Sequence, residues 1–163
     1  MVRRIAQDVG ALVARVAVGA VFLAHGWQKY QKGHGELAQS FADLGIPMPE
    51  ISALFALVAE LGGGGLLILG LLTPLASLAL VVVMAGAAFY VHLGNGLLLS
   101  DGGYEYVLTL GGLCLLLAVT GAGRLSLDYL VFGKRGGSLL TGVPERTPAP
   151  AEAASAGTPE VKA

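Results

Sequence analysis

The stretch that decides the fold is Leu54-Phe-Ala-Leu-Val-Ala-Glu-Leu-Gly-Gly-Gly-Gly-Leu-Leu-Ile-Leu-Gly-Leu-Leu72, an apolar run that contains one carboxylate, Glu60. With the residues from Ile51 onward, it approaches the roughly 20 apolar residues that a helix needs to cross a bilayer. Glu60 then lies near the middle of the membrane, where a charge costs about 2.5–3.5 kcal/mol on insertion scales and is a functional candidate by default. Four glycines, Gly62 to Gly65, follow the carboxylate and leave room for a close neighbour.

The composition of the whole chain agrees with a membrane protein. Of its 163 residues, 55% are hydrophobic and 13% are charged, whereas soluble domains carry about 25% charged residues. The net charge of -1 argues against nucleic acid as a partner, since nucleic acid is bound through a strong basic excess. One cysteine, Cys114, offers neither an internal disulfide nor a dithiol, and it is expected to pack as a small apolar residue.

Four segments are long and apolar enough to be membrane spans, namely residues 9–27, 51–72, 75–93 and 104–121. Backbone hydrogen bonding in lipid permits only helices or closed barrels, and these segments lack the alternation of barrel strands. The sequence therefore predicts an all-α membrane domain over residues 1–133, built as an antiparallel bundle of four transmembrane helices.

Positive charge near the ends of the spans predicts the orientation of this bundle. One side of the membrane would carry Arg3, Arg4, Arg124, Lys134 and Arg135, and the other would carry Lys29 and Lys32. Both termini are therefore predicted to be cytoplasmic. A cleaved signal peptide is the alternative for the first span, but Arg15 interrupts it and no clean small-x-small cleavage site follows.

Two segments outside the spans have patterns of their own. In the connection 29–50, Leu37, Phe41 and Leu44 recur at helical spacing and predict a short amphipathic helix that faces outward.

After the fourth span, residues 124–133 predict a short interfacial helix whose first turn would be capped by Ser126 or Asp128. The Pro- and Ala-rich residues 134–163 have few large apolar side chains and predict a disordered cytoplasmic tail.

Ionisable side chains gather at related depths of the predicted spans. On the first helix, Arg15 shares one broad face with two further basic or imidazole groups. Helical rise places Glu60 roughly 15 Å below the outer surface, with Arg15 deeper still. We therefore expect Arg15 to balance the charge of Glu60. Above them, the outer level of the bundle would contain His25, Lys29, His92 and Glu105.

This polar cluster has more than one interpretation. In one interpretation the charges are structural pairs that fix how the helices associate. As a site, the histidines titrate near neutral pH and with Glu60 or Glu105 would relay protons. The same groups would suit the polar head of a quinone or a lipid, with the glycines leaving room for its ring or tail. Helix ends give no diagnostic metal-ligand spacing, so no metal site is predicted.

The ordered set of motifs resembles the DoxX family of small bacterial membrane proteins, and the resemblance covers about residues 8–133. It rests on Arg15, Phe22-Leu-Ala-His-Gly-Trp-Gln-Lys29, Gly45-Ile-Pro-Met-Pro49, Glu60 with its glycines, Leu67-Ile-Leu-Gly70, His92, Gly103-Tyr-Glu105 and Gly121-Ala-Gly-Arg-Leu-Ser-Leu-Asp128.

The resemblance implies a four-helix protein of the bacterial inner (plasma) membrane. Relatives include small subunits of a thiosulfate:quinone oxidoreductase and proteins tied to other membrane oxidoreductase complexes. It also implies that the polar positions His25, Lys29, Glu60, His92, Glu105, Ser126 and Asp128 belong to the family pattern.

The leading hypothesis is a membrane subunit of a redox complex, with an outward-facing polar pocket for a quinone or a lipid-like molecule. A partner protein would hold the redox centre, because the chain encodes no cofactor site of its own and is not expected to be catalytic alone. Self-association remains open. Two alternatives also remain, a transporter of small solutes or lipids and a non-catalytic membrane scaffold.

Overall fold

The computed structural model describes residues 2–132, and for residues 2–4 it describes the backbone alone. All regular structure in that range is helical, with no strand. The elements are α1 (Val2–Lys32), α2 (His34–Asp43), α3 (Pro49–Val58), η1 (Ala59–Gly63), α4 (Gly64–Leu69), α5 (Thr73–Ala87), η2 (Ala88–His92), η3 (Leu93–Asn95), η4 (Leu99–Asp101), α6 (Glu105–Thr120) and α7 (Leu127–Phe132). The predicted tail, residues 134–163, lies outside the described residues.

Three helical stretches are long and apolar enough to cross a membrane, namely Ile5–Lys32, Pro49–Leu69 and Thr73–Asn95. The fourth predicted span corresponds to α6, which is apolar but has 16 residues. The all-α prediction is therefore confirmed for the described part of the chain. The structure also places a helix, α2, in the connection where the amphipathic pattern predicts one.

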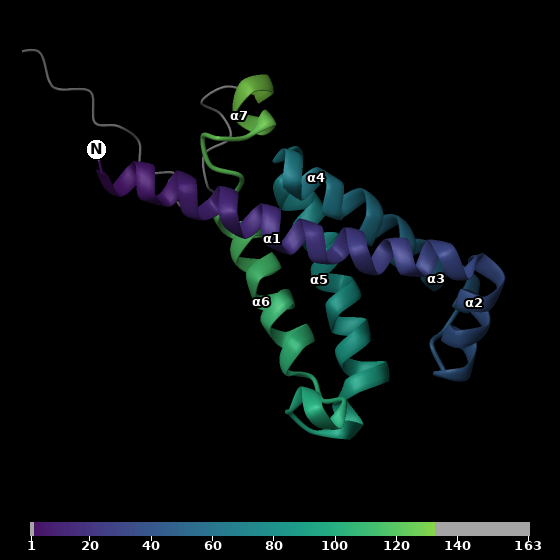
Figure 1. Ribbon diagram of the computed structural model, residues 1–163. Helices are drawn as coiled ribbons and strands as arrows, with labels where there is room; N and C mark the ends of the chain where they lie inside the picture. The colour runs from purple at the N-terminus through teal and green to yellow at the C-terminus, as the bar shows by residue number, and fades with distance from the viewer. Residues whose placement is uncertain (1, 133–163) are drawn as a thin grey trace, which may run out of the picture.

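The long helices form two pairs that meet at one end and diverge toward the other (Figure 1). α1 runs alongside α3 and α4, while α5 packs against α6. α7 lies at the end where the pairs meet, and α2 lies at the far end of the α1 pair (Figure 1).

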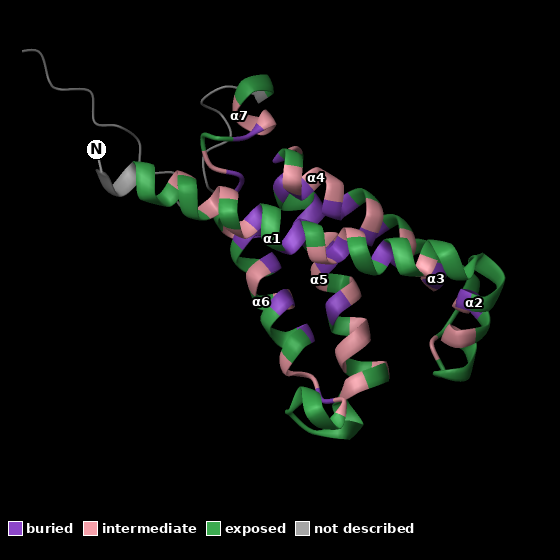
Figure 2. Cartoon of the chain, viewed as in Figure 1, coloured by how far each residue is buried: buried purple, intermediate pink, exposed green. Residues whose placement is uncertain are grey.

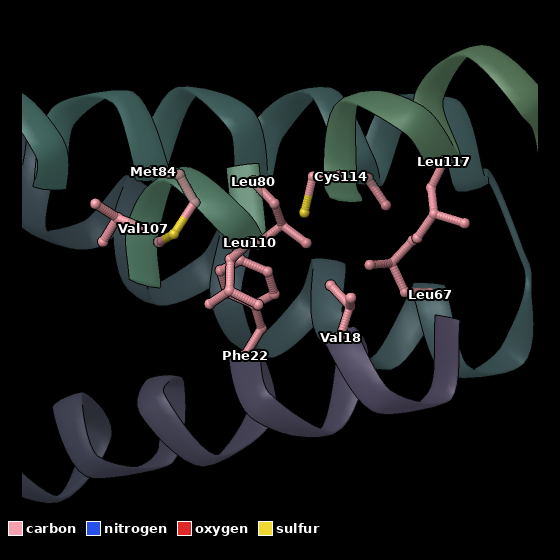
Figure 3. Close-up of a cluster of buried hydrophobic side chains, with 10 residues drawn as sticks. Val18, Phe22, Leu67, Leu80, Met84, Val107, Leu110, Cys114 and Leu117 are labelled. Atoms are coloured by element: carbon pink, nitrogen blue, oxygen red, sulfur yellow. The ribbon is translucent and has the colours of Figure 1, made fainter. Parts of the chain in front are cut away.

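The apolar core lies where the two pairs meet. Buried residues concentrate on the facing sides of the helices, and exposed ones cover the outside (Figure 2). Phe22 of α1, Leu67 of α4 and Leu80 of α5 are almost fully buried, and Cys114 of α6 lies among them (Figure 3). Cys114 is thus a packing residue, while large apolar side chains such as Leu108 point outward, as expected for a surface in contact with lipid.

The glycine run divides into two packed and two open positions. A Cβ on Gly64 would lie 2.9 Å from the carbonyl oxygen of Gly19 on α1, and one on Gly63 would lie 3.3 Å from Leu80. A Cβ on Gly62 or Gly65 would meet nothing within 4 Å. Small residues let membrane helices approach closely, so two adjacent glycines bring α5 against η1, at Gly63, and α1 against α4, at Gly64.

Candidate functional site

Glu60 forms a bidentate ion pair with Lys29 of α1. Lys29 Nζ donates to Oε1 over 2.7 Å and to Oε2 over 2.6 Å. Glu60 is 2% exposed, and the Lys29 side chain is 24% exposed. Charge-assisted hydrogen bonds of this length are among the stronger ones in proteins, and they offset part of the cost of burying Glu60.

Gly26 of α1 makes this pairing geometrically available. A Cβ on Gly26 would lie 2.9 Å from Leu61 and 3.1 Å from Cβ of Glu60, so α1 and η1 are in close contact here. Lys29 lies almost one helical turn beyond Gly26, and its long side chain reaches back to the carboxylate. A glycine three residues before a lysine was the available sequence signal for this pair.

The predicted pairing of Arg15 with Glu60 is not formed, because each group has another partner. Arg15 is fully buried and its Nη2 donates to the backbone carbonyl of Leu125 over 2.6 Å. Its guanidinium lies against Gly70, where no Cβ would fit. Nε and Nη1 of Arg15 have no hydrogen-bond partner among the described residues. Arg15 therefore ties the segment after α6 to the middle of α1.

That segment is fixed further by two capping residues. The Asp128 carboxylate accepts from the backbone N–H groups of Leu72 over 2.7 Å and Thr73 over 3.0 Å, at the start of α5. Ser126 Oγ accepts from the N–H of Tyr129 over 3.2 Å and so caps α7. Of the two residues predicted to cap the short interfacial helix, Ser126 does so and Asp128 caps α5 instead.

A cavity of about 850 Å³ lies between the diverging helix pairs. Its lining is mainly apolar and aromatic, with Phe22, Ile51, Phe55, Val82, Met84 and Val107 among the residues. Four predicted site residues, His25, Lys29, Glu60 and His92, also line it. An apolar cavity with a few convergent polar groups is the usual form of a ligand site.

Two of these polar residues lie in π-helical turns. Glu60 belongs to η1 and His92 is the last residue of η2. Single π turns within α-helices are rare and frequently occur at functional sites. Here the two π turns lie on opposite helix pairs, and each places an ionisable side chain on the same cavity.

Both cavity histidines are held through one ring nitrogen. Nδ1 of His25 lies 2.9 Å from the carbonyl oxygen of Val21, and Nδ1 of His92 lies 2.7 Å from that of Gly102. The His25 ring is also 6.2 Å from the ring of Tyr106, which lines the same cavity. The rings are therefore oriented by the backbone and by an aromatic neighbour.

Glu105 has a different role from the other predicted site residues. Its Oε1 accepts from the N–H of Leu99 over 2.6 Å, and Glu105 is not among the residues that line the cavity. It orders the connection between η4 and α6. Within residues 2–132, no three His, Cys, Asp or Glu side chains are grouped so as to hold a metal ion.

Comparison with known proteins identifies the family. The sequence model of the DoxX family matches residues 10–93, a range that covers just over half of the chain and includes Lys29, Glu60 and His92. The chain belongs to the DoxX family. No solved structure matches it significantly.

Relatives of known sequence align with most of this DoxX protein. "Putative oxidoreductase CatD" of Bacillus subtilis (strain 168) is 32% identical over 133 residues, which are 81% of this chain and 95% of the relative. Inner membrane protein YphA of Escherichia coli (strain K12) is 34% identical over 76% of this chain and 91% of its own. Inner membrane protein YqjF of the same organism is 32% identical, with 77% and 94% covered. With its apolar spans, this DoxX protein is a multi-pass protein of the bacterial inner membrane.

Sequence reasoning missed the aromatic part of the cavity in this DoxX protein. Tyr90 and Tyr106 line it from α5–η2 and α6, and Ser52 lines it from α3. Tyr90 lies two residues before His92, and a regular helix would point these two side chains far apart. Their spacing in the sequence therefore gives no signal that both side chains line one cavity.

Proposed function

We propose that this DoxX protein is the membrane subunit of a redox complex and binds the head of a quinone or a lipid-like molecule in the cavity between its helix pairs. In this proposal the four apolar helices form a four-span bundle, both termini are cytoplasmic and the cavity faces outward. The name of the Bacillus subtilis relative supports an oxidoreductase setting.

The observation that carries the proposal is the Lys29–Glu60 ion pair on the wall of a mainly apolar cavity. Such a pair is costly inside a membrane and is weak evidence for stability by itself. Two Lys29 N–H groups are donated to Glu60, and the third is free to donate to a ligand oxygen. A flat ring with oxygen substituents fits both the apolar walls and this donor.

The exposure of the lining residues supports entry from the lipid. Ile51, Phe55 and Val82 line the cavity and are also exposed on the outside of the helices, at 65%, 44% and 59%. Side chains that belong both to the cavity wall and to the lipid-facing surface mark an opening between α3 and α5. A ligand dissolved in the membrane would reach the ion pair by this opening, and this favours quinones and lipids over water-soluble solutes.

A partner protein would supply the redox centre in this proposal. The lone cysteine of the chain, Cys114, is buried in the core and cannot form a dithiol. The exchange of electrons with the bound ring would therefore occur through a partner docked on the membrane domain.

Binding measurements on the purified protein in lipid nanodiscs test the proposal. Decylubiquinone, in its oxidised and reduced forms, would be titrated against the wild type, Glu60→Gln and the control Glu36→Gln, an exposed carboxylate on α2. Glu60→Gln removes the charge that holds the Lys29 ammonium in place for the ligand. Hydrogen bonds to charged groups contribute about 1.5–3 kcal/mol, so we expect binding to weaken about tenfold or more. The control should bind like the wild type.

The same variant tests the function in cells. Glu60→Gln should abolish a quinone-linked activity of the host membrane while the protein stays at normal abundance. Unchanged ligand affinity and unchanged activity in this variant would overturn the proposal. Specific binding of a phospholipid headgroup, with no binding of either quinone form, would reassign the cavity to lipid handling.

A further inference from the structure

We infer that the cavity prefers the reduced, hydroxyl-bearing form of its aromatic ligand, because His25 and His92 both present a hydrogen-bond acceptor to it. This inference rests on the proposed function and specifies the oxidation state that the site selects. The ligand class is a dihydroxy aromatic ring, such as the head of a quinol.

The protonation of both rings follows from their partners. Nδ1 of His25 and Nδ1 of His92 each contact a backbone carbonyl oxygen, at 2.9 Å and 2.7 Å. A carbonyl oxygen can only accept, so each Nδ1 carries the proton and donates it. In a neutral imidazole the other nitrogen, Nε2, is then an acceptor. No protein group in the described range is hydrogen-bonded to either Nε2.

Lys29, Tyr90 and Tyr106 do not distinguish the two oxidation states. The third N–H of Lys29 can donate to a quinone carbonyl or to a quinol oxygen, and the two tyrosine hydroxyl groups donate and accept equally well. Ser52 Oγ donates its proton to the carbonyl oxygen of Pro47 over 2.8 Å. The two Nε2 atoms, Ser52 Oγ and the Glu60 carboxylate can therefore only accept. A quinone ring has no O–H group to offer them, whereas a quinol has two.

Two sources can supply such a ring, a prenylated quinol from the membrane and a soluble dihydroxybenzene. They share the O–H groups that His25 and His92 would recognise. They differ in the apolar tail, which the walls at Phe55 and Val82 would contact. A comparison of decylubiquinol with tail-free hydroquinone distinguishes them, and we expect the tailed ligand to bind more tightly.

The test uses three ligands of one shape, namely decylubiquinol, decylubiquinone and the dimethyl ether of the quinol. They would be titrated anaerobically into the full-length protein in nanodiscs. Each O–H···N bond contributes about fivefold when its net free energy is near the typical value for a hydrogen bond. The quinol should therefore bind about tenfold or more tightly than the quinone, and the ether should lose this advantage.

Variants of His25 and His92 test whether these two residues cause the preference for quinol over quinone. His25→Phe and His92→Phe keep a ring but remove the acceptor, and each should lower the quinol preference several-fold. The matched control is His34→Phe on α2, because His34 is exposed and does not line the cavity. Thermal unfolding at the wild-type temperature in each variant shows that the protein is folded.

The outcomes separate this inference from the proposed function. Equal binding of quinol, quinone and ether by the wild type would overturn the inference and leave the proposed function standing. A quinol preference that persists in both His→Phe variants would also overturn it. Absence of binding by any of the three ligands would overturn the proposed function and the inference with it.

Discussion

Two basic residues on the same helix, the half-buried Lys29 and the buried Arg15, have very different surroundings in the molecule. Lys29 meets a carboxylate, Glu60, through two hydrogen bonds and borders a cavity of about 850 Å³. Arg15 meets a single backbone carbonyl, that of Leu125, and is closed in by Gly70. One charge lies on the wall of a cavity, and the other is enclosed by the chain itself.

The comparison shows that an ionisable group within a span is not by itself a binding site. Arg15 is the more deeply buried of the two, yet its contacts hold the segment from Gly121 to α7 against the end of α4. Lys29 and Glu60 differ because the helix pairs diverge beside them (Figure 1). The shape of the helix packing, more than the charge, separates a site from a structural contact.

The largest effect is expected from removing one member of the ion pair. Lys29→Met would leave the buried Glu60 carboxylate without its partner, and breaking a buried pair in this way costs about 3–5 kcal/mol. The unfolding free energy in mixed micelles measures it. The double variant Lys29→Met/Glu60→Leu should recover most of the stability and none of the ligand affinity. A single variant as stable as the wild type would show that the pair is not structurally coupled.

A smaller loss is expected where the first helix pair is in closest contact. Gly64→Ala would place a methyl group 2.9 Å from the Gly19 carbonyl oxygen, and overpacking of this kind costs about 1–3 kcal/mol. Its neighbour Gly65 is open, so Gly65→Ala should be neutral or slightly stabilising. Thermal unfolding of the two variants side by side checks the difference. Equal losses would contradict the close approach of α1 and α4.

At the Arg15 end, the capping carboxylate has a more modest role. Asp128→Ala removes the acceptor for Leu72 N–H and Thr73 N–H, and the loss of a helix cap costs about 1 kcal/mol. Hydrogen exchange should rise at the start of α5 and in α7, with ligand affinity unchanged. The exposed Asp101 provides the control Asp101→Ala. Weakened ligand binding in Asp128→Ala would mean that the two ends are coupled.

The smallest effect on stability and ligand affinity is expected at Glu105, which does not line the cavity. Glu105→Gln keeps an oxygen that can accept from Leu99 N–H, so stability should change by less than about 0.5 kcal/mol. Ligand affinity should match that of the wild type, in contrast to Glu60→Gln. Titration of both variants with decylubiquinone compares them directly. Equal loss of ligand affinity in both variants would mean that the binding site includes Glu105 at the start of α6.

The helices were predictable because their signals are local. Apolar length marks the spans, the spacing of Leu37 and Phe41 marks α2, and Ser126 marks the start of α7. The orientation of the bundle in the membrane stays a prediction from the positive charges.

The partners of the charges were not predictable, because they depend on how helices cross. The predicted depths of the side chains in the membrane favoured a pair of Arg15 with Glu60. In the structure, α1 and η1 are in close contact at Gly26, and Lys29 pairs with Glu60 instead. The π turns at Glu60 and His92 likewise depend on tertiary packing and leave no periodic signal. The sequence therefore identified most of the polar residues that line the cavity, but only the structure shows which of them contact one another.

A ligand site at the Lys29–Glu60 pair can be tested by photolabelling the protein in native membrane vesicles with a photoreactive quinone, followed by peptide mapping. We expect labelling of cavity residues on both helix pairs, such as Phe55 and Tyr90, and loss of that labelling with excess decylubiquinol or in Glu60→Gln. Labelling confined to outward residues such as Leu108 and Leu115, unaffected by competitor, would contradict a ligand site at the Lys29–Glu60 pair.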